Sequence, residues 1–355
     1  MTRKPTRRQS SAPTIADVAR LAGVSPMTVS RVINGETNVR DTTREAVNAA
    51  IQQLNYAPNP AARSLAGAEQ IRIGLLYSNP SAAYLSEFLV GGLEQASRAD
   101  VQLVIEKCDV GPHEVEVARR LVASGVDGVI LPPPLCDAAD VIAALAETNT
   151  PVVAVASSQP ADPVNAVSID DYQAAFDMAR HVARLGHRRI GFIIGNPNQS
   201  ASLRRLEGYR AALDAAGLEP DEALVQQGMF TYRSGLDAAE RLLDLADVPT
   251  AIFASNDDMA AATVAVAHRR GLDVPGDLTV CGFDDTALAT TIWPELTTIR
   301  QPIAEMSREA VDLLVRDIRA RRNHRPEPRR HLLLDFELVR RQSDAAPRRR
   351  PRDAH

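Results

Sequence analysis

The stretch Thr14–Asn34 reads TIADVARLAGVSPMTVSRVIN and contains two short helical patterns separated by one glycine. Gly23 supplies the positive φ that ends a helix and starts a tight turn. We therefore predict one helix over residues 15–22 and a second over residues 26–34.

The ends of both predicted helices carry residues that suit those positions. Thr14 is a good N-cap residue, and Asp17 stands three residues further on, in the manner of a capping box. Ser25 can cap the second helix, and Pro26 takes the first helical position, where its missing N–H costs nothing.

The apolar positions of these helices lie on one face of each. Ala19 is small enough for a close helix crossing, Val29 and Val32 face inward, and a third helix over about 44–54 completes a small core. The pattern predicts a helix-turn-helix unit whose second helix can enter the major groove of DNA.

Charge is unevenly distributed along the 355 residues, whose formal net charge is −5. Residues 1–70 hold nine Lys and Arg against five Asp and Glu, and residues 321–355 hold eleven Arg against five acids. Residues 71–320 hold the remaining 20 basic and 35 acidic residues. A mildly acidic total can therefore contain a basic DNA-reading module.

Several classes of protein are excluded by composition. No apolar run approaches the roughly 20 residues that span a bilayer, and the basic, polar N-terminus does not have the pattern of a secretion signal. Cys108, Cys136 and Cys281 are scattered without CxxC spacing, so we expect reduced thiols in a cytoplasmic protein and no metal site.

Beyond residue 71, short apolar runs alternate with longer amphipathic stretches. The apolar runs, read as strands, cover 71–78, 101–108, 126–134, 151–158, 188–195, 250–256 and 278–285. The stretches between them, read as helices, include 84–98, 112–124, 171–186, 203–217, 234–246 and 257–271. This alternation is typical of doubly wound α/β layers with parallel sheets, and its length suits two such lobes.

Several strings carry a resemblance to a known family. They are ADVARLAGVSPMTVSRVIN at 16–34, TREAV at 43–47, LNYAPNPAARSLAG at 54–67, GHRRIGFI at 186–193, SNDDMA at 255–260, VCGFDD at 280–285 and PELTTIRQP at 294–302. Together they resemble the lactose/galactose repressor (LacI/GalR) family of bacterial transcription regulators, over all of the chain except its two tails.

The resemblance implies a small all-α helix-turn-helix head joined to a two-lobed α/β domain like a periplasmic binding protein. We expect a disordered basic arm at 1–13 and a DNA-binding domain at 14–58. A hinge helix and linker follow at 59–70, an effector-binding and dimerisation domain at 71–340, and a disordered basic tail at 341–355.

The family pattern also implies which residues contact DNA. Arg31 can donate two hydrogen bonds to a guanine edge, whereas Leu65 of the hinge is placed to push between base steps from the minor groove. The full predicted set is Pro26, Met27, Thr28, Arg31, Asn34, Thr43, Asn59, Ala62 and Leu65.

For the effector we take residues that follow the apolar runs, because doubly wound lobes bind ligands at the carboxyl ends of their strands. Arg205 and Asp284 match the family's effector positions and rank first, and aromatic side chains can cover the C–H face of a sugar ring. The predicted set is Tyr77, Ser78, Tyr84, Ser158, Arg205, Phe230, Asn256, Asp284 and Trp293.

One position departs from the pattern. Many sugar-responsive members carry an aspartate where this chain has Ala156, and Ser157 and Ser158 are left to compensate. We expect a sugar or glycoside as effector, with a purine or nucleoside corepressor as the alternative.

The expected function is a cytoplasmic, nucleoid-associated repressor of carbohydrate-utilisation genes. It would bind a near-palindromic double-stranded operator as a homodimer, without cofactor, metal or membrane. Two other classes are weighed against it. A cytoplasmic sugar-binding protein would leave the first 67 residues without a role. An enzyme would need a nucleophile–base motif, which does not stand out, and His187 is read as structural.

Overall fold

The computed structural model describes residues 13–33, 39–54, 56, 70–78, 81–108, 111, 113–161, 164–325 and 327–348. The chain divides into two compact units, residues 1–70 and residues 71–355. Four of the predicted DNA contacts lie outside the described residues, as do residues 1–12 of the predicted arm and 59–69 of the predicted hinge. These four are Asn34, Asn59, Ala62 and Leu65.

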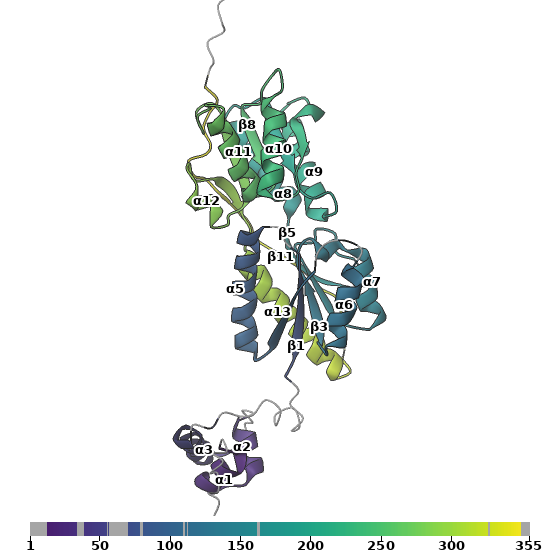
Figure 1. Cartoon of the computed structure of the whole chain (residues 1–355), viewed down its shortest axis with the longest axis vertical. Coiled ribbons are helices and arrows are strands. Elements are labelled where there is room, and N and C mark those ends of the chain that lie inside the picture. The colour runs from purple at the N-terminus through teal and green to yellow at the C-terminus, as the bar shows by residue number, and fades with distance from the viewer. Residues whose placement is uncertain are drawn as a thin grey trace, which may run out of the picture. The chain divides into compact units, whose positions relative to one another are not determined.

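The first unit contains α1 (Ile15–Ala22), α2 (Pro26–Ile33) and α3 (Asp41–Leu54), drawn in purple in Figure 1. The Asp17 carboxylate accepts hydrogen bonds from the Thr14 amide at 3.0 Å and the Thr14 hydroxyl at 2.6 Å. Gly23 has φ 65°, and the Thr28 amide donates to Ser25 Oγ at 3.1 Å. The predicted caps and the predicted turn are confirmed.

The core of the first unit is built from the predicted inward faces. Its buried members are Val18, Ala19, Val29, Val32, Val47 and Ala50. With these positions buried, the other face of α2 is left toward solvent.

The second unit contains two six-stranded sheets, one per lobe. The first sheet has the order β11 (His331–Leu334), β5 (Asn165–Ile169), β4 (Val152–Val155), β3 (Gly128–Leu131), β1 (Arg72–Tyr77), β2 (Gln102–Lys107). The second has the order β12 (Glu337–Val339), β10 (Thr297–Arg300), β9 (Thr279–Asp284), β8 (Ala251–Ala254), β6 (Ile190–Ile194), β7 (Val225–Gln227). Among the described residues the strands pair in parallel, except for β10 with β12.

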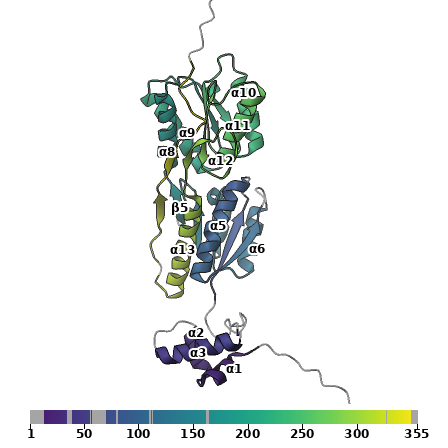
Figure 2. The same ribbon diagram turned by 90° about the vertical axis from the view of Figure 1, so that its left-hand side faces the viewer.

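Helices cover both faces of each sheet, as Figures 1 and 2 show. Around the first sheet lie α5 (Ala82–Ala99), α6 (Glu114–Ala123), α7 (Ala139–Glu147) and α13 (Ile303–Arg322). Around the second lie α8 (Asp171–Arg184), α9 (Ser200–Ala215), α10 (Tyr232–Leu243), α11 (Asp257–Arg269) and the short α12 (Leu288–Thr291). Strands β3, β4 and β8 are buried along their whole length, which explains their unbroken apolar sequences.

In the part of the chain that the structure describes, the backbone passes between the lobes three times. It crosses from β5 to α8, from β10 to α13, and from β11 to β12, each time within a few residues. Both lobes are therefore assembled from separate parts of the sequence, and the cleft between them is bordered by the carboxyl ends of parallel strands.

The segment after residue 340 corrects one prediction. We expected a disordered tail from residue 341, but residues 341–348 lie against the second lobe. The Ser343 hydroxyl donates to the carbonyl of Val280 at 2.5 Å, and the Thr297 hydroxyl donates to the Asp344 carboxylate at 2.5 Å. Side-chain hydrogen bonds to the sheet order this polar segment, and composition alone does not reveal them.

Candidate functional site

A cavity lies between the two lobes, and the space that it spans, its open mouth included, is about 420 Å3. Five of the nine predicted effector residues line it, namely Tyr84, Arg205, Phe230, Asn256 and Asp284. The other residues of its wall are Ser81, Pro133, Ala156, Gln199, Ala201 and Gln301.

The topology brings these residues together at the carboxyl ends of the strands. Tyr84 is on α5, which follows β1, and Arg205 is on α9, which follows β6. Asn256 caps α11 directly after β8, and Asp284 is the last residue of β9. This is the edge at which doubly wound sheets bind their ligands.

Arg205 is 4% exposed and is fixed by two hydrogen bonds. Its Nε donates to Asp171 Oδ1 at 2.8 Å, and its Nη1 donates to the carbonyl of Ser255 at 2.5 Å. The guanidinium carbon also lies 3.5 Å from the centre of the Phe283 ring and 5.7 Å from that of Phe230. The remaining N–H groups are available to a ligand in the cavity.

Asp284 is the buried acid of the site. Gln301 Nε2 donates to its Oδ1 at 2.6 Å. Burial raises the pKa of this carboxyl well above its ordinary value, and the positive charge of Arg205 acts against that rise. The second carboxyl oxygen can accept a hydrogen bond from a ligand hydroxyl.

Two polar atoms of the cavity wall have no hydrogen-bond partner among the described residues. They are the Tyr84 hydroxyl and Gln301 Oε1, both of them buried. Leaving a buried polar atom unpaired costs roughly 1–3 kcal/mol, so such atoms point to a ligand or to water that pairs them.

Three residues of the cavity wall have strained backbone angles. Ala156, Phe230 and Asp284 have backbone φ angles of 59°, 58° and 112°. Residues other than glycine rarely adopt this region. Such strain costs roughly 1–3 kcal/mol per residue and is found mainly where function needs a particular geometry.

Asn256 both caps a helix and lines the cavity. Its Oδ1 accepts from the amide of Met259 at 3.0 Å, and its Nδ2 donates to the carbonyl of Phe230 at 3.1 Å. The second bond ties the aromatic wall of the cavity to the start of α11.

The other four predicted effector residues are not part of the cavity wall. Tyr77 ends β1 and Ser78 follows it, both half-buried. Ser158 lies behind the wall, where its hydroxyl donates to Asp171 Oδ2 at 2.5 Å. Trp293 is 73% exposed, so its side chain faces solvent and not the cavity.

Gln199, Gln301 and Ser81 line the cavity but were not predicted from the sequence. Gln199 and Ser81 precede α9 and α5, and Gln301 begins the crossover from β10 to α13. Their positions near strand and helix ends could have marked them as candidates. That they meet at one cavity depends on how the chain crosses between the lobes, which the spacing of residues in the sequence does not reveal.

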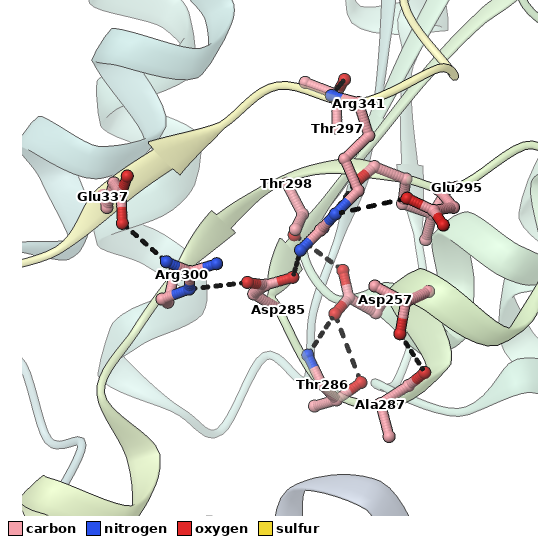
Figure 3. A network of polar contacts seen from close by, with 12 residues as sticks. Asp257, Asp285, Thr286, Ala287, Glu295, Thr297, Thr298, Arg300, Glu337 and Arg341 are labelled. Atoms are coloured by element: carbon pink, nitrogen blue, oxygen red, sulfur yellow. Dashed lines mark hydrogen bonds and ion pairs between the residues drawn. The ribbon is translucent and has the colours of Figure 1, made fainter.

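A network of polar contacts around Asp257 and Asp285 lies beside the cavity in the second lobe (Figure 3). Asp257 Oδ1 accepts from the Thr298 hydroxyl at 2.7 Å, and its Oδ2 accepts from the Thr286 amide at 2.8 Å. Burial raises the pKa of Asp257 to about 7 despite these donors.

The same network braces two of the lobe crossovers. Asp285 pairs with Arg300 at 2.7 Å and with Arg341 at 2.6 Å, and Arg300 also pairs with Glu337 at 2.7 Å (Figure 3). Arg300 ends β10 and Glu337 begins β12, so these ion pairs fix both strands where they leave and enter the second lobe.

The described DNA-contact candidates lie in the first unit. Pro26, Met27 and Arg31 are exposed on α2, with Met27 64% exposed, whereas Thr28 and Thr43 are half-buried. Val29 and Val32 hold the opposite face of α2 in the core. This division leaves the predicted base-reading side chains accessible.

Neither a metal-binding cluster nor a membrane-spanning helix is found among the described residues. These residues contain no group of three or more His, Cys, Asp or Glu side chains that could hold a metal ion. Over the same residues, no helix has the length and apolar character needed to cross a bilayer.

A helix-turn-helix unit and a two-lobed domain with a cavity between its lobes define a class, the ligand-responsive DNA-binding regulators. A model of the lacI family of bacterial regulatory proteins matches residues 14–59, and a model of periplasmic binding protein-like domains matches residues 179–343. The chain belongs to the lacI family and is a DNA-binding transcriptional regulator.

Relatives with known names agree with this assignment. The chain is 36% identical over 333 residues to the HTH-type transcriptional regulator DegA of Bacillus subtilis, covering 93% of this chain and 97% of DegA. A structure of the transcriptional regulator CelR in complex with cellobiose has 35% identity and a TM-score of 0.71, covering 93% and 99% of the two chains.

A structure of the Lac repressor dimer bound to operator and the anti-inducer ONPF is also similar. It has a TM-score of 0.77 and 30% identity, and the alignment covers 95% of this chain and 100% of that chain. The predicted family and the predicted fold class are thus confirmed.

Proposed function

We propose that this regulator is a cytoplasmic repressor of carbohydrate-utilisation genes, controlled by a neutral sugar or glycoside bound in the cavity between its lobes. The observation that carries the proposal is the cavity wall itself. It combines a fixed guanidinium, a buried carboxyl, an aromatic side chain and two unpaired polar atoms.

The charge balance of the wall favours a neutral ligand. Arg205 is already paired with Asp171 at 2.8 Å, and both side chains are at least 95% buried. No spare positive charge among the wall residues remains for a phosphate or carboxylate ligand. Hydroxyl groups, in contrast, can both donate to Asp284 and accept from Arg205.

The aromatic wall supports a sugar as the ligand. Phe230 is 9% exposed and borders the cavity, so its face can cover the C–H side of a sugar ring. CelR, a relative of this chain, has been solved with cellobiose.

Thermal-shift measurements on the full-length protein test the proposal, since a ligand of the native state raises stability. The panel contains neutral monosaccharides, cellobiose, their phosphate esters and purine bases. We expect a neutral sugar to raise the Tm of wild type and to have a much smaller effect on Asp284→Asn. Asp140→Asn changes an exposed carboxylate of the first lobe and is the matched control.

Two results would overturn the sugar proposal. A rise in Tm with a purine and with no sugar would favour the corepressor alternative. Equal stabilisation of Asp284→Asn and wild type would place the sugar elsewhere.

We further propose that the operator is near-palindromic and is bound by a homodimer, because one helix-turn-helix unit contacts too few base pairs for specificity. The Lac repressor, a similar chain, is known as a dimer on its operator. Sedimentation should show a dimer, and a stable tetramer would contradict this.

A further inference from the structure

One contact across the cleft joins the lobes at the helix that carries Arg205. Helix α9 of the second lobe begins at Ser200, and its N-cap residue Gln199 makes no side-chain capping bond. The Asp137 carboxylate, from the first lobe, accepts from the Ser200 amide at 2.8 Å and from the Ser200 hydroxyl at 2.9 Å. A carboxylate near a helix N-terminus stabilises the unpaired amides there.

Asp137 is itself held by its own lobe. It ends the short helical turn Leu135–Asp137 after β3, and Ser157 Oγ donates to its Oδ1 at 2.5 Å. Ser157 follows Ala156, whose positive φ turns the chain at the end of β4. The strained backbone at Ala156 thus places Ser157 against Asp137.

Ser158 continues the contact between the lobes. Its amide donates to Ser200 Oγ at 2.9 Å, and its hydroxyl donates to Asp171 Oδ2 at 2.5 Å. Because Asp171 also holds Arg205, a continuous series of hydrogen bonds leads from Asp137 to the guanidinium of the cavity.

The position of α9 determines the shape of the cavity. Ala201 and Arg205 of this helix, and Gln199 before it, line the cavity. A shift of the first turn of α9 away from the first lobe would move all three. The far side of the cleft has its own crossing bond, from Ser81 Oγ to Asp258 Oδ2 at 2.6 Å, which does not involve α9.

We propose that Asp137 is a positioning residue that fixes α9, and with it Arg205, against the first lobe. Any effect of this positioning on the response to an effector rests on the proposed function of the cavity. The contact itself is tested without any sugar, so the two proposals fail separately.

Hydrogen–deuterium exchange of the full-length protein, read by mass spectrometry, tests the contact. In wild type the first-turn amides of α9, in a peptide covering 197–206, should exchange slowly. Asp137→Asn should raise their exchange by about tenfold or more, because it removes the charge and replaces one acceptor oxygen by an NH2 group that cannot accept from the Ser200 amide. Asp140→Asn, an exposed acid on α7, should leave exchange unchanged.

A second variant and a second peptide separate positioning from a general structural role. Ser200→Ala keeps the backbone bond to Asp137 and should raise exchange less than Asp137→Asn. The peptide covering β3 should keep its wild-type exchange in both variants. Fast exchange of α9 in wild type, no change in Asp137→Asn, or an equal rise in β3 would each overturn the proposal.

Discussion

Arg205 is fixed by contacts within the second lobe. Its ion pair with Asp171 is almost completely buried, and its guanidinium stacks on Phe283. Such a side chain offers its free N–H groups in one orientation, so little entropy is lost when a ligand hydroxyl binds. The same burial makes the residue a poor target for a simple functional test.

Arg205→Ala should therefore lower stability as well as effector binding. Removing one partner of a buried pair leaves an uncompensated charge, and we expect a loss of about 3–5 kcal/mol in the free energy of unfolding. Urea denaturation of the variant and of wild type checks this. A loss below about 1 kcal/mol would mean that Asp171 finds another partner.

Arg31→Ala should weaken binding to the specific operator by roughly 1–3 kcal/mol, the usual contribution of a guanidinium bonded to a guanine edge. Arg31 is exposed on α2, so the fold of the first unit should persist. Fluorescence anisotropy with an operator fragment measures the affinity. Weaker binding of the sugar by this variant would contradict the division of labour between the two units.

The raised pKa of Asp257 leads us to predict an unusual pH dependence of the protein's stability. Burial raises its pKa from 3.8 to about 7, so the folded protein holds this proton to a higher pH than the unfolded chain does. The contribution of this group to stability is therefore full below about pH 4, falls as the pH rises, and is lost above about pH 7.

The amide of Asp257→Asn cannot titrate, so the variant should lose less stability than wild type between pH 5.0 and pH 7.5. Urea denaturation at the two pH values measures the difference, with Asp140→Asn as control. If Asp257→Asn loses as much stability as wild type between the two pH values, the wild-type carboxylate is ionised throughout this range.

At the scale of single elements, the sequence predicted what local chemistry decides. Gly23, Ser25 and Pro26 determine the turn and both of its helix ends, because each suits one backbone conformation. The apolar runs of β3, β4 and β8 likewise identified buried parallel strands.

Edge elements were harder to predict. β7 and β12 are three residues long and partly exposed, so their sequences carry little pattern. The cavity shows the same division. Asp284 ends β9, Asn256 caps the helix directly after β8, and Arg205 lies on the helix after β6. Gln301, in contrast, reaches the cavity from a crossover whose path only the assembled lobes determine.

The C-terminal segment gives a test at this scale. A chain ending at Arg348 keeps the bonds of Ser343 and Asp344 to β9 and β10 and should unfold like wild type. A chain ending at Arg341 loses several buried hydrogen bonds, each worth roughly 1 kcal/mol, and should be clearly less stable. Equal Tm values for the two chains would show that the segment contributes nothing to stability.

The uneven distribution of charge separates the tasks of the two units. Residues 71–320 carry 35 acidic and 20 basic residues, a balance that DNA repels, whereas residues 1–70 carry an excess of basic residues. The field of the molecule therefore favours contact with DNA through the first unit. It also predicts that operator binding weakens steeply as salt is added.

The most direct test of the account measures operator affinity with and without a sugar. The full-length protein selects its operator from a random DNA library, and anisotropy then gives the Kd with and without the sugar that most raises the Tm. We predict a change of about fivefold or more in wild type and none in Asp284→Asn, which should bind the operator normally. An unchanged Kd in wild type, or an equal response of Asp284→Asn, would contradict control of DNA binding through this cavity.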